Sequence, residues 1–370
     1  MHHGFALRYL ADVMQWPPEV ESHELNWLGV MSEFKYDSYH DFLSGSRFAE
    51  SLLAWLQQFE ITDRAIAYKI LKEKLIFVNL PELQHLVRRA FPAHILPCLE
   101  SRTARILGCP RYLLRSNKKS IDALNELVKR TLFIALSDGA RIDYFRRATN
   151  DQVSNEQVLT TFELSDPKWT DLHEELMKRT GSSIAKFEAL VLIDDFTASG
   201  TTLVRQDDQN RWKGKLKKIS CDVLKKRPEL FSTELEIILH HYLGTQRIYD
   251  SITTKLTRMK SEELFAPLFT SGGPVISFGM LIHDNALVLP DGDRQIDSLL
   301  DKHFDPAIMT KHLLLGGKHV KHGFAGCGLP LIIEHNTPNN SLGILWAESP
   351  ANSCFPRKMR PLFRRRQRHN

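Results

Sequence analysis

Apolar residues in the central part of this chain form short continuous runs, each bounded by polar or turn-forming residues. The runs lie at residues 131–136, 158–164, 190–193, 235–242, 275–282 and 329–333. Continuous runs, unlike alternating ones, are typical of strands whose two faces are both buried in a parallel sheet. Helical patterns lie between several of these runs, as at 142–148, 171–179 and 248–259. The alternation predicts an α/β fold with a mainly parallel sheet.

The region before these strands has a different pattern. Amphipathic helical periodicity occurs at 46–59, 63–75, 81–91 and 121–130. We therefore expect residues 1–125 to form an α-helical N-terminal region, either a cap or a winged-helix-like module. Residues 126–350 would form the α/β domain, and residues 351–370 a basic C-terminal tail. A basic helical segment at 212–231 is longer than a strand-to-strand crossover needs, which predicts a helical insertion.

Charge is distributed unevenly along the 370 residues. The net charge is +5, but residues 357–370 contain seven Lys and Arg residues and no acid. The rest of the chain carries 42 basic and 44 acidic residues, so the basicity belongs to the tail. Such a tail either contacts nucleic acid or an acidic partner, or is a solvated end. Both interpretations stay open.

Other features limit the class of protein. No apolar run approaches the ~20 residues that a membrane span needs, and the N-terminus lacks a signal-peptide pattern. The five cysteines are widely spaced and odd in number, which does not suggest a disulfide framework. We therefore expect a cytoplasmic protein without a membrane partner. His319, His322 and Cys327 lack a fourth zinc ligand, so exposed loop histidines are favoured.

The most informative segment begins at the apolar run 190–193. Two carboxylates follow, Asp194 and Asp195, and then a loop rich in hydroxyl groups, and the pattern predicts a helix directly after this loop. Backbone N–H groups at a helix start, together with hydroxyl donors, favour a phosphate group. The expected phosphate-binding residues are Thr197, Ala198, Ser199, Gly200, Thr201 and Thr202. A Walker A loop is excluded because no glycine–lysine pair precedes the hydroxyl residues.

The segment resembles the PRPP-binding motif of type I phosphoribosyltransferases, which has four apolar residues, two acids, a spacer and Ser-Gly-Thr-Thr. The resemblance implies that Asp194 and Asp195 hold the ribose hydroxyls and a Mg²⁺ cofactor. It also implies that residues 197–202 surround the 5′-phosphate. The motif is more specific for the fold and a ribose-5-phosphate ligand than for catalysis, because regulatory proteins share this fold.

A second signature of that family is a loop that binds pyrophosphate, and its expected place follows the run 131–136. The residues there are Ser137, Asp138, Gly139, Ala140 and Arg141. Gly139 would form the tight turn, and Arg141 would supply charge for pyrophosphate and act with the two acids in catalysis. Asp138 departs from the family pattern, since basic or small residues are more usual there. It would either hold Mg²⁺ or prevent pyrophosphate binding.

A polar segment follows the last apolar run, and Asn336, Asn339 and Asn340 are its candidate substrate contacts. Turn formation is the competing explanation. Together these segments resemble the phosphoribosyltransferase-like effectors of bacterial conflict systems, including retron and antiphage operons. That resemblance implies an enzyme that transfers or releases a ribosyl group with loss of pyrophosphate. The alternatives are an inactive PRPP- or nucleotide-sensing regulatory protein, and an interaction subunit of a defence complex that contains nucleic acid. The resemblance also implies a protein partner from a defence operon.

Overall fold

The computed structural model describes residues 3–40, 42, 47–149 and 151–366. The chain divides into two compact units. We call residues 83–282 the central unit, and residues 1–82 together with 283–370 the terminal unit. These units do not follow the predicted boundaries after residues 125 and 350. Residues 83–125 pack with the main sheet, and residues 283–350 share a core with the N-terminal helices.

The helices and strands have the following bounds. The helices are α1 (His3–Met14), α2 (Pro18–Phe34), α3 (Phe48–Leu56), α4 (Ile61–Lys69), α5 (Leu80–Arg89), α6 (Leu96–Leu107), α7 (Lys118–Lys129), α8 (Ile142–Ala148), α9 (Asp166–Thr180), α10 (Lys215–Lys218), α11 (Gln246–Met259), α12 (Arg294–Lys302), α13 (Lys311–Leu314) and α14 (Gly343–Trp346). The strands are β1 (Ile76–Val78), β2 (Thr131–Ala135), β3 (Val158–Leu159), β4 (Phe187–Thr197), β5 (Arg205–Gln206), β6 (Trp212–Lys213), β7 (Phe231–Thr245), β8 (Val275–Ile282) and β9 (Leu331–Ile333).

The central unit is built on a five-stranded sheet in the order β3-β2-β4-β7-β8. All of its strand pairs are parallel, which confirms the predicted α/β fold. The chain enters the sheet at β2, adds β3 on one side and then crosses to β4 on the other. A topological switch point therefore lies between β2 and β4. Ligands in open α/β sheets bind beyond the carboxyl ends of the strands at such a point.

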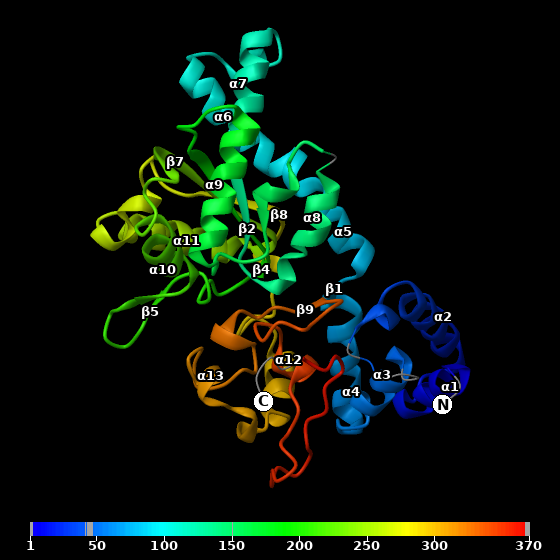
Figure 1. The fold of residues 1–370 in the computed structure, drawn as a ribbon. Coiled ribbons are helices and arrows are strands. Elements are labelled where there is room, and N and C mark those ends of the chain that lie inside the picture. The colour runs from blue at the N-terminus through cyan, green and yellow to red at the C-terminus, as the bar shows by residue number, and fades with distance from the viewer. Residues whose placement is uncertain (1–2, 41, 43–46, 150, 367–370) are drawn as a thin grey trace. The chain divides into compact units, whose positions relative to one another are not determined.

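Both faces of this sheet are covered by helices (Figure 1). Leu132 and Ile134 belong to the apolar core that also contains residues of α9 and α11. Phe133, between them, faces the opposite side, where its ring lies 6.0 Å from that of Phe91 and 5.5 Å from that of Phe145. Successive residues of a strand point to opposite faces, so burial of both faces explains why the run at 131–136 is continuous rather than alternating.

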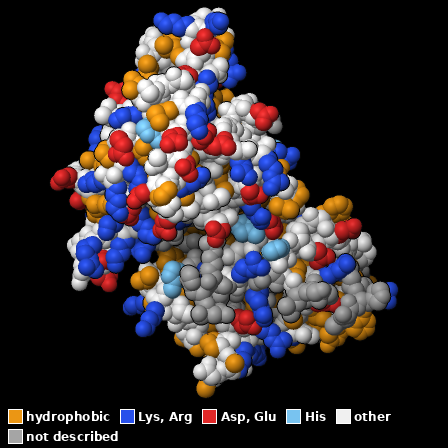
Figure 2. All heavy atoms as spheres, viewed as in Figure 1, with side chains coloured by type: hydrophobic (Ala, Val, Ile, Leu, Met, Phe, Trp, Pro, Cys, Tyr) orange, Lys and Arg blue, Asp and Glu red, His pale blue; other side chains and the backbone are white. Residues whose placement is uncertain are grey.

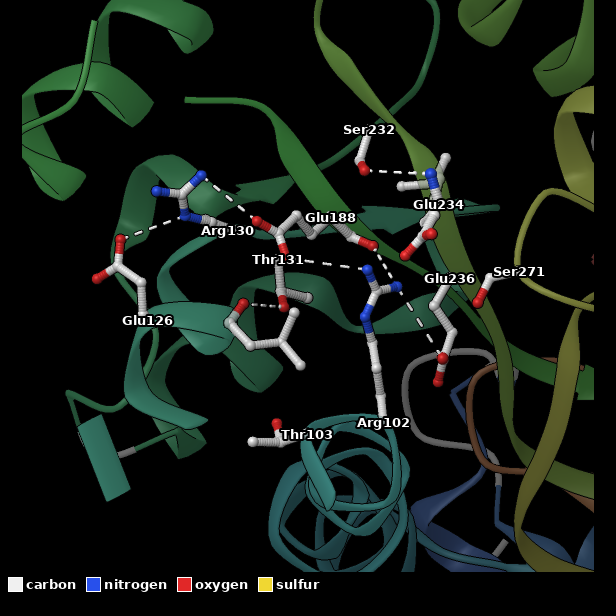
Figure 3. Close-up of polar contacts among 12 residues, drawn as sticks. Arg102, Thr103, Glu126, Arg130, Thr131, Glu188, Ser232, Glu234, Glu236 and Ser271 are labelled. Carbon is white, nitrogen blue, oxygen red and sulfur yellow. Dashed lines mark hydrogen bonds and ion pairs between the residues drawn. The ribbon is translucent and has the colours of Figure 1, made fainter. Parts of the chain in front are cut away.

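A network of polar side chains lies near the amino ends of β4 and β7, opposite to the carboxyl ends where ligands are expected (Figure 3). Arg102 of α6 is only 4% exposed as a side chain and lies between Glu188 and Glu236. It donates a hydrogen bond of 2.8 Å to the backbone oxygen of Glu188. Arg105 donates to the Glu236 carboxylate at 2.8 Å. Burial raises the pKa of Glu236, and the two arginines oppose that shift.

Two predicted elements of the central unit differ from the structure. The predicted strand at 158–164 is only two residues long, β3, because the backbone turns at Thr161, whose hydroxyl accepts a hydrogen bond of 3.1 Å from the amide of Glu163. The predicted helix after residue 202 is wrong, since residues 201–203 form a turn and the β5–β6 hairpin follows. The helical insertion starts only at α10 and continues as a π-helix, Ile219–Leu224.

The terminal unit contains a second, two-stranded sheet in which β1 pairs with β9 in parallel. The run at 329–333 is therefore a strand, but it does not belong to the five-stranded sheet. Phe363 is fully buried in the core of this unit and stacks on Phe48 with a centroid distance of 5.7 Å. The predicted basic tail is thus packed into the unit as far as the structure describes it.

Several cations of this C-terminal segment already have acidic partners. Arg364 pairs with Glu348 at 3.0 Å, and Arg357 pairs with Glu60 at 3.1 Å. The burial of Met359, Leu362 and Phe363 excludes a wholly solvated end for residues 351–366. In the described parts of both units, no helix has the length and apolar character needed to cross a bilayer.

Candidate functional site

The two predicted acids lie near the carboxyl end of β4, beside the switch point. The strand continues past them to Thr197, because β4 stays paired with β7 through the register Asp194–His241 and Thr197–Gly244. Asp194 is buried, whereas Asp195 is half-buried. The carboxylate of Asp195 accepts a hydrogen bond of 2.8 Å from the amide of Phe196. Strand pairing thus fixes the backbone of the acidic pair on a central strand.

The turn after β2 meets this acidic pair. The Ser137 hydroxyl donates a hydrogen bond to Oδ1 of Asp194. The backbone of Gly139 lies so close to Asp195 that a Cβ atom at residue 139 would be 2.1 Å from its Oδ2. Glycine at this position therefore permits the close approach to Asp195, and its backbone does not need a positive φ. The structure brings together the two sequence segments that were predicted to share one site.

A hydrogen bond from β7 stabilises the rest of this turn. The Tyr242 hydroxyl donates a hydrogen bond of 2.8 Å to the backbone oxygen of Ala140. Arg141 takes the left-handed conformation, with φ 46° and ψ 40°, immediately before α8 begins. A residue other than glycine costs about 1 kcal/mol or more in that conformation, and such strain concentrates at functional sites. Asp138 is exposed at the outside of the turn.

The hydroxyl-rich loop follows β4 at the same edge of the sheet. Gly200 has φ +65°, and a Cβ atom there would lie 2.7 Å from the Ile248 side chain of α11. Oγ of Ser199 and Oγ1 of Thr201 are 3.0 Å apart. The amides of Ser199, Gly200 and Thr202 have no acceptor among the residues that the structure describes. The loop therefore keeps backbone donors for an anion, although no helix dipole supports them.

Sequence reasoning missed the cation of this site, Lys215, which is the first residue of α10. Its Nζ atom lies 2.8 Å from Oδ2 of Asp194, and its side chain is 17% exposed. Burial raises the pKa of Asp194, and the neighbouring Asp195 raises it further, whereas Lys215 and Ser137 oppose the shift. The signal in the sequence was the basic character of the segment 212–231, but its fold was needed to single out one lysine.

Lys215 also lines a cleft of about 900 Å³ that reaches from Leu136, directly after β2, to Thr202 of the loop. The other cations in its lining are Arg205, Lys213, Lys217 and Lys218. Figure 2 shows Lys and Arg side chains gathered on the part of the surface formed by the β5–β6 hairpin and α10. Glu163 and Asp222 are the acids of the lining, and Lys218 pairs with Glu163 at 2.8 Å. The cleft is suited to an anionic ligand.

His241, beside Asp194 in the register of β7, is buried and also escaped sequence reasoning. Burial, with a smaller effect of Lys215, lowers the pKa of His241 to about 4, and Asp195 acts in the opposite direction. Its Nδ1 atom has no hydrogen-bond partner within the described part of the chain. The imidazole of His241, next to Asp194 in the sheet, is therefore neutral at neutral pH.

The oxygen atoms around the two acids do not form a set of ligands for a resident Mg²⁺ ion. Oδ2 of Asp194 is paired with Lys215, and Oδ1 accepts from Ser137 and, at 3.2 Å, from the amide of Asp195. The described residues contain no group of three or more His, Cys, Asp or Glu side chains placed to hold one metal ion. Asp138 is therefore not part of such a group.

The asparagines predicted as substrate contacts belong to the terminal unit, after β9. Asn340 donates to the backbone oxygen of Phe324 at 3.2 Å, and the side-chain oxygen of Asn336 accepts from the amide of Arg366 at 2.9 Å. The backbone oxygen of Asn339 accepts from Phe324. β9 pairs with β1 and is not a strand of the five-stranded sheet, so these asparagines do not follow a strand of that sheet, contrary to the expectation from sequence. The contacts that they make within their own unit are structural.

His322 likewise has a partner within the terminal unit. Its Nε2 atom lies 2.8 Å from Oδ1 of Asp297. The thiol of Cys327 accepts a hydrogen bond of 3.3 Å from the side-chain amide of Asn340. His322 and Cys327, two of the three residues considered for a zinc site, therefore make polar contacts with other residues of their own unit.

A parallel sheet with an acidic pair, a hydroxyl-rich loop and a tight glycine turn at its switch point defines a phosphoribosyltransferase-type fold. The comparison with protein families agrees. The chain belongs to the PRTase-CE family, whose model matches residues 52–365 and so includes segments of both units. No curated protein and no solved structure matches the chain.

Proposed function

We propose that the central unit binds PRPP or a related ribose-5-phosphate compound at the switch point between β2 and β4. The observation that carries the proposal is the meeting of the Gly139 turn with the acidic pair, next to a loop with available amide donors. The loop 197–202 would bind the 5′-phosphate, and Asp195 the ribose hydroxyls. The turn 137–141, with Arg141, would face the pyrophosphate group.

We further propose that the ligand reacts by ribosyl transfer. The bond between C1 of the ribose and the pyrophosphate oxygen breaks, and C1 forms a bond to an acceptor nitrogen or oxygen. The acceptor loses its proton to solvent, and pyrophosphate leaves with the bonding electron pair. The chain contributes by holding the two reactants and by placing cations near the leaving group, since no protein nucleophile is needed.

The cleft of about 900 Å³ supports this assignment, because its five cations lie next to the loop and the β2 end. Mg²⁺ enters the proposal as the partner of the pyrophosphate in solution, because Lys215 holds Asp194. The wider role that we propose, an effector in bacterial antiphage defence, follows from the resemblance to conflict-system proteins. A protein partner or a nucleic acid that contacts the C-terminal segment belongs to the same proposal.

The test is to incubate the protein with PRPP, Mg²⁺ and a mixture of bases and nucleotides. Pyrophosphate and ribosylated products are then followed by mass spectrometry. Asp195→Asn should abolish product formation, whereas Asp143→Asn, which removes an exposed carboxylate paired with Arg147 in α8, should leave it unchanged. Equal turnover in the two variants would contradict the proposed site.

A sensor that binds PRPP without converting it is the second candidate. The exposed carboxylate of Asp138 favours it, because a negative charge on the turn opposes pyrophosphate binding. PRPP binding without formation of pyrophosphate in the same mixture would select the sensor.

A further inference from the structure

The position of Lys215 has a consequence for how the acidic pair binds its ligand. A ribose hydroxyl or a metal ion at Asp194 needs a carboxylate oxygen with a free lone pair. Oδ1 already accepts two hydrogen bonds, and Oδ2 pairs with the ammonium group, so one lone pair remains, on the oxygen that contacts the cation. The side chain of Asp194 is 11% exposed and that of Lys215 17%, so water competes little for either charge.

Backbone hydrogen bonds fix the position of Lys215, so its contact with Asp194 does not depend on the conformation of a long side chain alone. The amide of Lys215 donates to the backbone oxygen of Thr202 at 3.1 Å, and the amide of Leu216 donates to that of Leu203 at the same distance. Gly214 takes φ +112°, and a Cβ atom there would lie 2.6 Å from the Leu203 oxygen. The start of α10 is thus bonded to the end of the phosphate-binding loop.

This arrangement links three parts of the candidate site through one residue. The backbone of Lys215 contacts the loop, its ammonium contacts the acid, and its side chain lines the cationic cleft. An ammonium group supplies one positive charge and three donors. At Asp194 it neutralises the carboxylate and leaves the remaining donors for an oxygen of the ligand.

We propose that Lys215 replaces a metal ion at Asp194, so that the site binds its phosphorylated sugar without requiring Mg²⁺. The proposal rests on the proposed function, because it concerns the same ligand. It predicts that Asp194 acts as a positioning residue that holds Lys215, while the direct contacts to the sugar come from Asp195 and the loop.

The experiment is a calorimetric titration of the full chain with PRPP, once in excess EDTA and once in excess Mg²⁺. For the wild-type protein, the two dissociation constants should agree within about threefold. Lys215→Met should weaken binding in EDTA by about tenfold or more, and Mg²⁺ should restore it, because the freed carboxylate then accepts the metal. Lys215→Arg, which keeps the charge, should stay independent of Mg²⁺.

Lys217→Met is the matched control, because Lys217 lines the same cleft while Asp194 pairs with Lys215. It should leave the ratio of the two dissociation constants as in the wild type, and circular dichroism checks that each variant is folded. The proposal is overturned if wild-type binding needs Mg²⁺, or if Lys215→Met binds in EDTA as well as the wild type. If wild-type protein binds PRPP in neither condition, the proposed function itself fails, and this inference with it.

Discussion

Gly139→Ala tests the close approach that joins the β2 turn to the acidic pair. The added methyl group would start 2.1 Å from Oδ2 and 2.7 Å from Cγ of Asp195. The carboxylate or the turn must move by roughly 1 Å to remove this overlap, and forced overpacking of this kind costs about 1–3 kcal/mol. Gly139 is not among the residues with positive φ, so alanine suits its backbone and the contact alone is tested.

The expected result has two parts, measured by thermal unfolding and by titration with PRPP. Stability should fall, with a change of about 2–4 °C in Tm for each kcal/mol in a domain of this size. Binding should weaken by at least about tenfold, because a displacement of about 1 Å at a site of this kind has effects of up to a hundredfold.

Gly29→Ala is the control, since Gly29 lies in α2 and a Cβ atom there meets nothing within 4 Å. It should stabilise the protein by about 0.5–1 kcal/mol through helix propensity, with PRPP binding unchanged. Wild-type stability and affinity in Gly139→Ala would refute the close approach of the turn to Asp195.

Three further changes probe other parts of the molecule. Arg102→Ala should destabilise by about 3–5 kcal/mol in urea unfolding, because it removes the buried arginine that lies between the carboxylates of Glu188 and Glu236. Arg105→Ala, whose side chain is 61% exposed, should cost less than about 1 kcal/mol, and equal costs would contradict the buried network. Phe363→Ala should cost about 3–5 kcal/mol, since its ring is fully buried, and a loss below about 1 kcal/mol would show that the C-terminal segment is not part of the core. Burial lowers the pKa of His241 from about 6.5 in the unfolded chain to about 4 in the folded protein. The folded protein therefore favours the neutral imidazole, which stabilises it fully above pH 6.5. This stabilisation is lost as the pH falls from 6.5 towards 4. The loss is about 3 kcal/mol. The free energy of unfolding, measured from pH 7 to pH 4, should therefore decline less steeply in His241→Gln than in the wild type. Identical slopes would mean that His241 is not held neutral.

Much of the central sheet follows from local sequence. The strand at 275–282 and the helix at 142–148 have the predicted bounds, because an apolar run or a helical period ends at clear turn residues. The acidic pair and the loop after it were recognisable for the same reason, since all their residues are adjacent in the chain.

The errors concern contacts between distant segments. The run at 329–333 reads as a strand, yet nothing local shows that its partner is β1 rather than β8. The C-terminal segment is basic, but Phe363 packs among residues more than 280 positions earlier, such as Phe48. Lys215 is one of several lysines in its segment, and only the fold places its ammonium against Asp194. Charge and periodicity carry no information on such pairings.

The central claim is that the switch point of the central unit is a ribose-phosphate site, and calorimetric titration with PRPP tests it most directly. The account predicts saturable binding of one PRPP per chain by the wild-type protein, and weakening of about tenfold or more in Asp195→Asn. Inorganic pyrophosphate and free ribose should compete poorly, because each fills only part of the site. Folded wild-type protein that binds no PRPP, or that binds it equally well after Asp195→Asn, would contradict the account.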